Sequence, residues 1–420
     1  MNTLLKLRTR ILATTLLCAA FLPQSQAADS NWTPTWTASP QPVWANDFVL
    51  PLGLPASLRD QTVRQVVRAS LGGPRVRIVL SNEYGSQPLQ VGAAHIALAG
   101  DAAGSTRGAS RIVTFGGQAA VTVPAGAPLV SDPVAMDIAP LQRLAVSLYF
   151  PQTTPVTTIH WDGLQPAQIA DGNVAHAASL KAGREVNSRL FLSAVLMDTA
   201  PGTRSVVTFG DSITDGAAST PGTDSRWPDF LARRLAGHNV AVLNAGISGG
   251  RVLKNHMGPN ALARFERDVR GQPGVASVVL LMGINDISWP GSSFEPGEPA
   301  TQADALIAGY RQLITRARSR GVRIVGATLT PFESALTMPG SPIANYYSPA
   351  KDALRQRINH WIRNSGEFDA VLDFDAVVRD PLNPLRILPA YDSGDHLHLG
   401  DAGNKAVADS IDLKLLLGDR

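Results

Sequence analysis

Four short segments of this 420-residue chain hold the residue types that nucleophilic catalysis requires. Ser212 ends a Gly-Asp-Ser sequence, another serine lies in the glycine-rich segment 246–250, Asn285 follows a Gly-Ile pair, and Asp395 precedes His398 by three residues. A serine hydroxyl is a weak nucleophile until a base takes its proton, and a histidine oriented by a carboxylate can be that base. Together these segments predict an activated serine, although each segment alone is also compatible with a helix cap or a tight turn.

The elements that must position these segments follow from the hydrophobic pattern after residue 203. Short apolar runs alternate there with stretches in which apolar residues recur at helical spacing. The expected strands are 206–209, 240–243, 275–281, 322–328 and 370–374, and the expected helices are 227–235, 261–269, 303–320, 349–363 and 402–417. This alternation predicts an α/β fold with a parallel sheet covered on both faces.

Three of the four segments directly follow predicted strands. Ser212, Asn285 and the glycine-rich segment each come after one of the apolar runs, and His398 comes just before the last predicted helix. In an open parallel sheet, ligands bind beyond the carboxyl ends of the strands. We therefore expect the candidate residues to meet at one edge of the sheet.

Residues 29–200 have a different pattern, in which glycine and proline separate many short strands. The expected strands include 75–80, 111–115, 120–123, 142–150 and 157–161, and only 175–182 has a helical pattern. Such a pattern predicts a β-sandwich or a jelly roll. The chain is thus predicted to divide into a β-sandwich-like accessory domain at 29–200 and a catalytic domain at 203–418.

The N-terminus has the features of a secretory signal peptide. Three basic residues precede an apolar run at 11–22, and Ala27 ends a small-x-small cleavage pattern. The run is shorter than the ~20 apolar residues that a membrane-spanning helix needs. We therefore expect cleavage after a signal peptide at 1–27, a secreted or periplasmic protein, and no integral membrane segment in the mature chain.

Removal of segment 1–27 also changes what the composition implies. The full chain has a formal charge of +3, and this segment holds three basic residues and no acidic ones, so the remaining chain is formally neutral. A neutral chain has no basic surplus that favours nucleic acid or an anionic membrane as partner. Cys18, the only cysteine, lies in the same segment, so we expect no disulfide and no cysteine metal ligand in the mature protein.

The four segments, in this order, resemble the sequence blocks of the SGNH, or GDSL, hydrolase family. The resemblance covers about 203–418, which is roughly half of the chain, and rests on the serine, glycine, asparagine and histidine blocks together. The Arg-Trp-Pro sequence at 226–228 and the Asn-Ala-Gly-Ile-Ser-Gly sequence at 244–249 also look like secreted acylhydrolases associated with plant-polysaccharide esters. The resemblance implies a flavodoxin-like three-layer fold and a serine esterase that needs no cofactor.

The resemblance also implies a role for each residue. Ser212 would be the nucleophile, His398 the general base, and Asp395 the carboxylate that orients the imidazole. The backbone N–H groups of Ser212 and Gly249 and the side chain of Asn285 would form the oxyanion hole, which stabilises the tetrahedral intermediate. These roles imply an acyl-Ser212 intermediate.

Two other interpretations of the same segments remain open from the sequence. Residues 246–250 fit Gly-x-Ser-x-Gly, the nucleophile elbow of α/β-hydrolases, which would make Ser248 the nucleophile. That assignment leaves the Gly-Asp-Ser segment and Asn285 without a role. His396 and His398 could belong to a metal site, but no cluster of further ligands is evident in the sequence, so we expect neither a metal nor a cofactor.

The expected substrate is a small acyl group, such as acetyl, on a carbohydrate, for example an acylated polysaccharide. The alternatives are an aryl or lipid-type esterase with the same residues, an acyltransferase, and a carbohydrate-binding protein whose hydrolase half is inactive. No long apolar lid segment is evident, which disfavours a lipase.

The tryptophans of the β half could stack on sugars, although filling the sandwich core is the commoner role; they are Trp32, Trp36, Trp44 and Trp161. The β half could instead form one wall of the active site.

Overall fold

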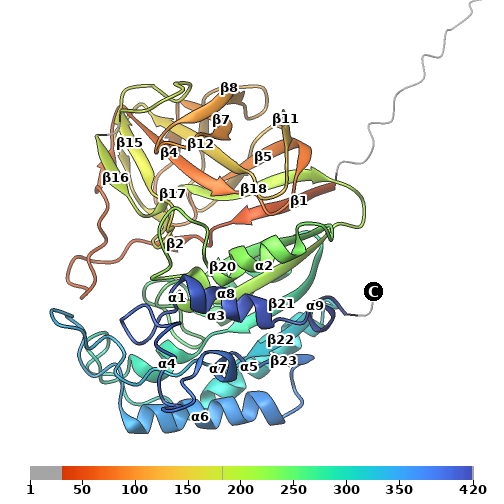
Figure 1. Ribbon diagram of the computed structural model, residues 1–420. Helices are drawn as coiled ribbons and strands as arrows, with labels where there is room; N and C mark the ends of the chain where they lie inside the picture. The colour runs from red at the N-terminus through yellow and green to blue at the C-terminus, as the bar shows by residue number, and fades with distance from the viewer. Residues whose placement is uncertain (1–30, 182, 419–420) are drawn as a thin grey trace, which may run out of the picture. The chain divides into compact units, whose positions relative to one another are not determined.

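Two antiparallel sheets form most of the N-terminal half, in a computed structural model that describes residues 31–181 and 183–418 (Figure 1). The predicted signal peptide at 1–27 lies outside the described residues. The first sheet contains, in spatial order, β1 (Asn31–Thr37), β18 (Leu192–Thr199), β5 (Gly73–Ser81) and β10 (Pro128–Val130), with β11 (Val134–Ile138) also paired to β5. The second contains β16 (Arg184–Val186), β15 (Ala167–Asp171), β4 (Gln61–Arg68), β12 (Arg143–Phe150), β7 (Ala93–Ala99) and β8 (Thr106–Val113). Shorter pairings join β13 (Thr154–Pro155) to β3 (Ser57–Leu58), β14 (Thr158–His160) to both β17 (Arg189–Leu190) and β2 (Gln41–Pro42), and β6 (Leu89–Val91) to β9 (Val121–Val123).

Alternation of apolar and polar residues explains why these two sheets pack together. In β5, Val76, Ile78 and Leu80 are buried, whereas Arg77 and Val79, which alternate with them, are partly exposed. These side chains share one apolar core with Val63 and Val146, which come from the second sheet. An apolar layer between two antiparallel sheets is the arrangement of a sandwich, so the predicted antiparallel β domain is confirmed.

The helical pattern at 175–182 does not produce a helix in the described residues. Residues 175–181 form turns and irregular structure instead. The Arg64 guanidinium donates hydrogen bonds to the carbonyls of Ala175 (3.3 Å) and Ala177 (2.7 Å), and the N–H of Thr106 donates to Ala178 (2.8 Å). The prediction of a possible helix was wrong, because the sandwich takes the carbonyls that intrahelical hydrogen bonds would need.

The C-terminal half contains one parallel sheet. Its spatial order is β20 (Val240–Gly246), β19 (Arg204–Gly210), β21 (Val275–Leu281), β22 (Arg323–Ala327) and β23 (Ala370–Leu372). In chain order this is 2-1-3-4-5, the flavodoxin-like order, in which the direction of winding reverses beside the first strand. The predicted parallel α/β fold is therefore confirmed, with strand boundaries within a few residues of those expected.

The helices of this half fall into two groups. Within each group, the helices contact one another. One group contains α2 (Trp227–Leu235), α7 (Phe374–Val378) and α8 (Asp401–Ser410), and the other contains α3 (Ala261–Phe265), α5 (Ala303–Arg318) and α6 (Pro349–Asn364). Since the winding reverses at β19, right-handed crossovers place these groups on opposite faces of the sheet. The short helices α1 (Ser212–Asp215) and α4 (Ile284–Ser288) follow strands directly, and the π-helix η1 (Glu266–Arg270) continues α3.

The predicted closing helix at 402–417 is two helices, α8 and α9 (Leu413–Leu417). The Asp412 side chain accepts a hydrogen bond of 2.8 Å from the N–H of Lys414 and so caps a new helix. The Arg234 guanidinium donates to the carbonyls of Ala408 and Ile411. These side-chain bonds replace the intrahelical bonds that a continuous helix would make.

None of the helices within 31–181 and 183–418 is long and apolar enough to cross a membrane.

The register of the parallel sheet aligns the carboxyl ends of three adjacent strands. Gly210, at the end of β19, lies opposite Gly246 of β20 and Leu281 of β21. The segments that follow these strands therefore leave the sheet at the same edge, beside the point where the winding reverses. This is the edge at which open parallel sheets bind ligands.

The β half packs against this α/β half within one compact unit, Asn31–Arg420. β1 runs next to β20 (Figure 1), and Thr37 donates a hydrogen bond of 3.1 Å to the carbonyl of Asn244. The Arg143 guanidinium donates to the carboxylate of Asp224 at 2.7 Å. The predicted boundary near residues 200–203 falls between β18 and β19.

Candidate active site

The short helix α1 holds Ser212 at the carboxyl end of β19. The Asp211 carboxylate caps this helix by accepting a hydrogen bond of 3.1 Å from the N–H of Ile213. The backbone therefore turns sharply from strand to helix at the serine. The Ser212 side chain is almost entirely buried, and the surface that remains faces a cavity.

Ser212, His398 and Asp395 form a continuous chain of hydrogen bonds. The hydroxyl oxygen of Ser212 lies 2.8 Å from Nε2 of His398, and Nδ1 of His398 lies 2.6 Å from Oδ2 of Asp395. The other oxygen of Asp395 accepts from the N–H groups of Leu397 (2.9 Å) and His398 (2.8 Å). With the proton on Nδ1, Nε2 is free to accept the serine proton, which is the arrangement that a general base requires.

Burial and charge act against each other at this pair. Burial opposes the imidazolium form of His398, but the charge and hydrogen bond of Asp395, together with the charges of Asp162 and Asp211, outweigh burial and raise the pKa of His398. Burial likewise opposes the charged form of Asp395, yet His398 and the hydrogen bonds that this carboxylate accepts hold its pKa well below its usual value. Asp395 therefore stays ionised and stabilises the imidazolium that forms when His398 takes a proton.

Asn285 and Gly249 lie at the same cavity as Ser212. One amide hydrogen of Asn285 goes to the carbonyl of Gly250 at 3.0 Å, which leaves the second available to a substrate oxygen. Gly249 has a φ of +74°, and a Cβ there would lie 2.3 Å from Sδ of Met257. Only glycine fits at this turn, so its backbone can approach a ligand closely.

Tyr346 orients the Asn285 amide. Its hydroxyl donates to Oδ1 of Asn285 at 2.8 Å, and both side chains are buried. This contact fixes which end of the amide carries the hydrogens. Tyr346 lies in the loop between β22 and α6, and its sequence neighbourhood contains no motif, so sequence reasoning missed it.

Ser248, the competing nucleophile, has acidic partners instead of a basic one. Its hydroxyl lies 3.1 Å from Oδ2 of Asp215 and 3.0 Å from Oδ2 of Asp162. His160 lies nearby, but its Nε2 contacts Oδ1 of Asp215 at 2.9 Å. No histidine is a hydrogen-bond partner of Ser248 among the described residues, so the geometry of nucleophile and base is met at Ser212 and not at Ser248.

His396 does not pair with His398 at a common site. Nδ1 of His396 lies 2.6 Å from Oδ2 of Asp392, whereas His398 contacts Asp395 and the serine. Within the residues that the structure describes, no group of three or more His, Cys, Asp or Glu side chains is placed to hold a metal ion.

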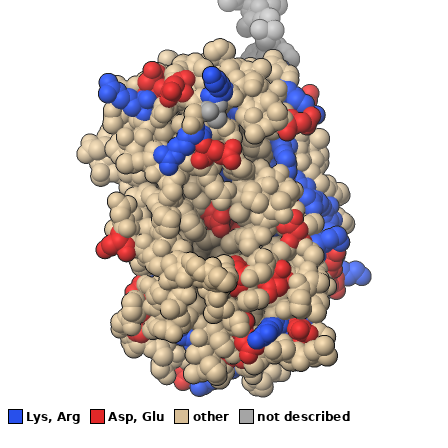
Figure 2. All heavy atoms as spheres, turned by 60° about the vertical axis from the view of Figure 1, so that its left-hand side comes forward, with Lys and Arg blue, Asp and Glu red and all other residues tan. Residues whose placement is uncertain are grey.

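The cavity beside Ser212 has a volume of about 510 Å³ and a largely apolar lining. Both halves of the chain contribute to it: Leu50, Trp161 and Asp162 come from the β half. The apolar side chains from the α/β half are Met257, Trp289, Phe294, Leu336, Met338, Ile343 and Leu397. Figure 2, which brings the left-hand side of Figure 1 forward, shows a hollow in the middle of this face.

A segment at 336–343, between β22 and α6, covers part of this cavity. The sequence showed no long apolar lid, and this segment is short and rich in proline and glycine. It nevertheless contributes apolar side chains to the lining. The size of the cavity therefore depends in part on a loop whose hydrophobic pattern does not predict a lid.

The tryptophans of the β half serve two different purposes. Trp36 is buried in the sandwich core, as expected for an aromatic residue in this kind of domain. Trp161 instead lines the cavity, and its ring lies 5.3 Å from that of Trp44, centroid to centroid. The β half therefore forms one wall of the candidate active site, which is one of the roles considered for it from the sequence.

Residues 208–406 match the sequence profile of the GDSL-like lipase/acylhydrolase family. This range contains all five candidate residues, from Ser212 to His398. No protein in a set of curated sequences matches the chain significantly.

Several solved structures resemble about half of this chain. A GDSL-like lipase from Bacteroides thetaiotaomicron is 19% identical and covers 52% of this chain and 90% of its own, with a TM-score of 0.37. The M. smegmatis aryl esterase is 16% identical and covers 49% and 95%, with a TM-score of 0.37. A carbohydrate acetylesterase family member from Sinorhizobium meliloti is 18% identical and covers 51% and 99%, with a TM-score of 0.38.

Proposed function

Because residues 208–406 belong to the GDSL-like lipase/acylhydrolase family, we propose that this carboxylic-ester hydrolase works through an acyl-Ser212 intermediate. The observation that carries the proposal is the chain of hydrogen bonds from Ser212 through His398 to Asp395 at the wall of a cavity. The base is within hydrogen-bond reach of both the nucleophile and the carboxylate that orients it.

The reaction follows from these positions. Nε2 of His398 takes the hydroxyl proton while Oγ of Ser212 forms a bond to the ester carbonyl carbon. The carbonyl oxygen becomes an oxyanion, which the N–H groups of Ser212 and Gly249 and the amide of Asn285 stabilise. The alcohol then leaves with the proton from His398, and a water molecule, deprotonated by His398, releases the acid and restores Ser212.

For the substrate, we propose an ester with an apolar group larger than acetyl. The support is the apolar lining of the cavity, in which Trp289, Phe294 and Met338 surround space for several carbon atoms. Burial of apolar surface contributes about 25 cal/mol per Å², so such a group would bind more tightly than acetate.

A small acyl group on a carbohydrate is the second candidate, as the sequence suggested. The observation in its favour is the polar part of the cavity wall, where Asp162 and Ser248 lie next to Ser212. Carboxylate and hydroxyl groups can hydrogen-bond sugar hydroxyls.

We also propose a secreted or periplasmic location, on the support of the leader-like segment at 1–27.

A chain-length series separates the two substrates. Hydrolysis of p-nitrophenyl esters from acetate to octanoate should show kcat/KM rising beyond acetate and then falling when the acyl chain exceeds the cavity. A maximum at acetate, together with acetate release from acetylated xylan or pectin, would favour the carbohydrate substrate. Absence of hydrolysis of every ester by the wild-type protein would contradict the proposed function as a whole.

A further inference from the structure

Asp162 places a carboxylate from the β half inside the cavity that contains Ser212 and His398. It lies two residues after His160, which is the last residue of β14. Its side chain is held at both oxygens: Oδ2 lies 3.0 Å from Oγ of Ser248, and Oδ1 accepts a hydrogen bond of 3.2 Å from the amide of Asn187. The carboxylate therefore has a defined position relative to the catalytic serine.

Hydrogen bonds compensate the charge of Asp162 less fully than that of its neighbour Asp215. Asp215 accepts from the N–H of Ser248 at 2.9 Å and lies 2.9 Å from Nε2 of His160. The Ser248 hydroxyl has one hydrogen, so it can donate to only one of the two carboxylates at a time. Asp162 thus depends on a shared hydroxyl and on one amide.

Apart from His398, the described residues that line the cavity supply no positive charge. Among the described residues that line it, none is a lysine or an arginine, and the charged groups apart from Asp162 are the pair Asp395 and His398. Figure 2 shows acidic atoms beside the hollow of this face, whereas the basic side chains visible there lie away from it. An ester with a negative charge near its reacting carbonyl would lie close to the Asp162 carboxylate in this partly enclosed cavity.

We propose that Asp162 determines the charge specificity of the esterase site, so that neutral and cationic esters are hydrolysed in preference to anionic ones. The inference rests on the proposed function, because it assigns a further residue to the same site. Two like charges several ångströms apart in a partly buried cavity repel each other strongly enough to change kcat/KM by about tenfold or more. The β half would therefore select substrates as well as close the cavity.

The protonation state of Asp162 adds a second measurable consequence. Burial and the nearby charge of Asp215 raise the pKa of Asp162 to about 6. The titratable groups that face it are Asp215 on α1, His160 on β14 and His398 near the C-terminal end. Since the carboxylate loses its charge below this pKa, discrimination against anionic esters should weaken as the pH falls from 8 to 5.5.

The test compares two esters of similar size, neutral p-nitrophenyl butyrate and anionic mono-p-nitrophenyl succinate. The quantity of interest is the ratio of their kcat/KM values, because changes in the protonation of His398 affect both esters and cancel in the ratio. The wild-type protein should favour the neutral ester, and Asp162→Asn should reduce this ratio about tenfold. Asp162→Glu keeps the charge and should keep most of the discrimination.

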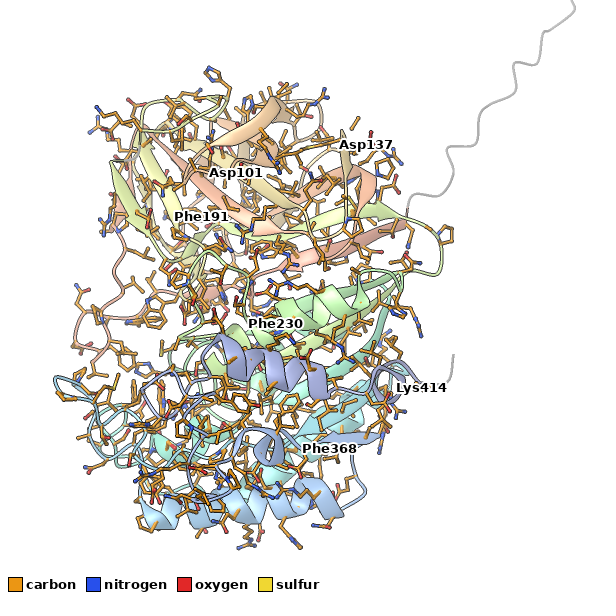
Figure 3. All side chains as sticks on the ribbon, viewed as in Figure 1. Asp101, Asp137, Phe191, Phe230, Phe368 and Lys414 are labelled. Carbon is orange, nitrogen blue, oxygen red and sulfur yellow. The ribbon has the colours of Figure 1, made fainter. Side chains whose placement is uncertain are left out.

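Asp137→Asn is the matched control. Asp137 is an exposed aspartate on β11 of the same half (Figure 3), so its removal changes the net charge equally without altering the cavity. This variant should leave the ratio unchanged. If Asp162→Asn and Asp137→Asn have the same ratio as the wild type, the inference is wrong while the esterase function stands. If the wild-type protein hydrolyses neither ester, the proposed function itself fails.

Discussion

The hydroxyl oxygen of Ser212 lies 2.8 Å from Nε2 of His398, although 186 residues separate the two along the chain. The contact joins the end of the first strand of the parallel sheet to the segment before α8. It brings the proposed nucleophile and its proposed base into direct contact.

Replacing Ser212 with alanine should lower kcat by about 10⁴-fold or more, because no other hydroxyl within residues 31–181 and 183–418 is a hydrogen-bond partner of the His398 ring. Ser248→Ala should lower kcat by about tenfold at most, since this hydroxyl contacts only carboxylates. Steady-state hydrolysis of one p-nitrophenyl ester by both variants measures the difference. The reverse order of effects would make Ser248 the nucleophile.

Asn285→Ala should lower kcat by about 10²–10³ with little change in KM, because an oxyanion donor acts mainly in the transition state. Tyr346→Phe removes the hydroxyl that orients the Asn285 amide and should lower kcat by about two- to tenfold. In the double variant Asn285→Ala/Tyr346→Phe, the tyrosine change should have no further effect. Additive losses would show that Tyr346 acts independently of Asn285.

Gly249→Ala should abolish most of the activity and also destabilise the protein. A side chain at a φ of +74° costs about 1–2 kcal/mol, and its Cβ would lie 2.3 Å from Sδ of Met257. Gly291→Ala is the control, because Gly291 has a φ of +71° with no atom within 4 Å of its Cβ position. Thermal unfolding should show a loss of stability in both variants, whereas only Gly249→Ala should lose activity.

The acid limb of the kcat/KM profile should report His398. The imidazole must be neutral to accept the serine proton, and Asp395 raises its pKa despite burial. Activity should therefore fall as the pH drops through a value above 6.5, the ordinary pKa of histidine. Asp395→Asn removes this attraction, so its residual activity should show an acid limb at lower pH. An unchanged midpoint in this variant would mean that another group limits the rate.

Asp211→Asn should stabilise the protein at alkaline pH. Burial raises the pKa of Asp211 to about 7, and its Oδ2 has no hydrogen-bond partner among the described residues. A carboxyl whose folded pKa is raised contributes stability at low pH that is lost as the pH rises through that pKa. The variant should thus unfold at a higher temperature than the wild type at pH 8, by roughly 2–4 °C per kcal/mol, with the gain disappearing near pH 4.

Much of the site was predictable because it depends on short segments at the ends of regular strands. The apolar run 275–281 coincides with β21, and the positions of Ser212 and Asn285 immediately after strands place both at one edge. Hydrophobic periodicity and local turn chemistry act over a few residues, so they can be read from the chain itself. The end of α8 could not be read from the chain, because it depends on a hydrogen bond from Arg234, which lies on α2.

The sequence by itself determined the order of elements, the parallel sheet and the set Ser212, Gly249, Asn285, Asp395 and His398, because these follow from local pattern and motif. Only the tertiary structure distinguishes the surroundings of Ser212 and Ser248, because folding brings the imidazole of His398 to the Ser212 hydroxyl and carboxylates to the Ser248 hydroxyl. The tertiary structure likewise placed Asp162 and Tyr346 at the cavity, since contacts between distant segments leave no trace in the spacing of residues along the chain.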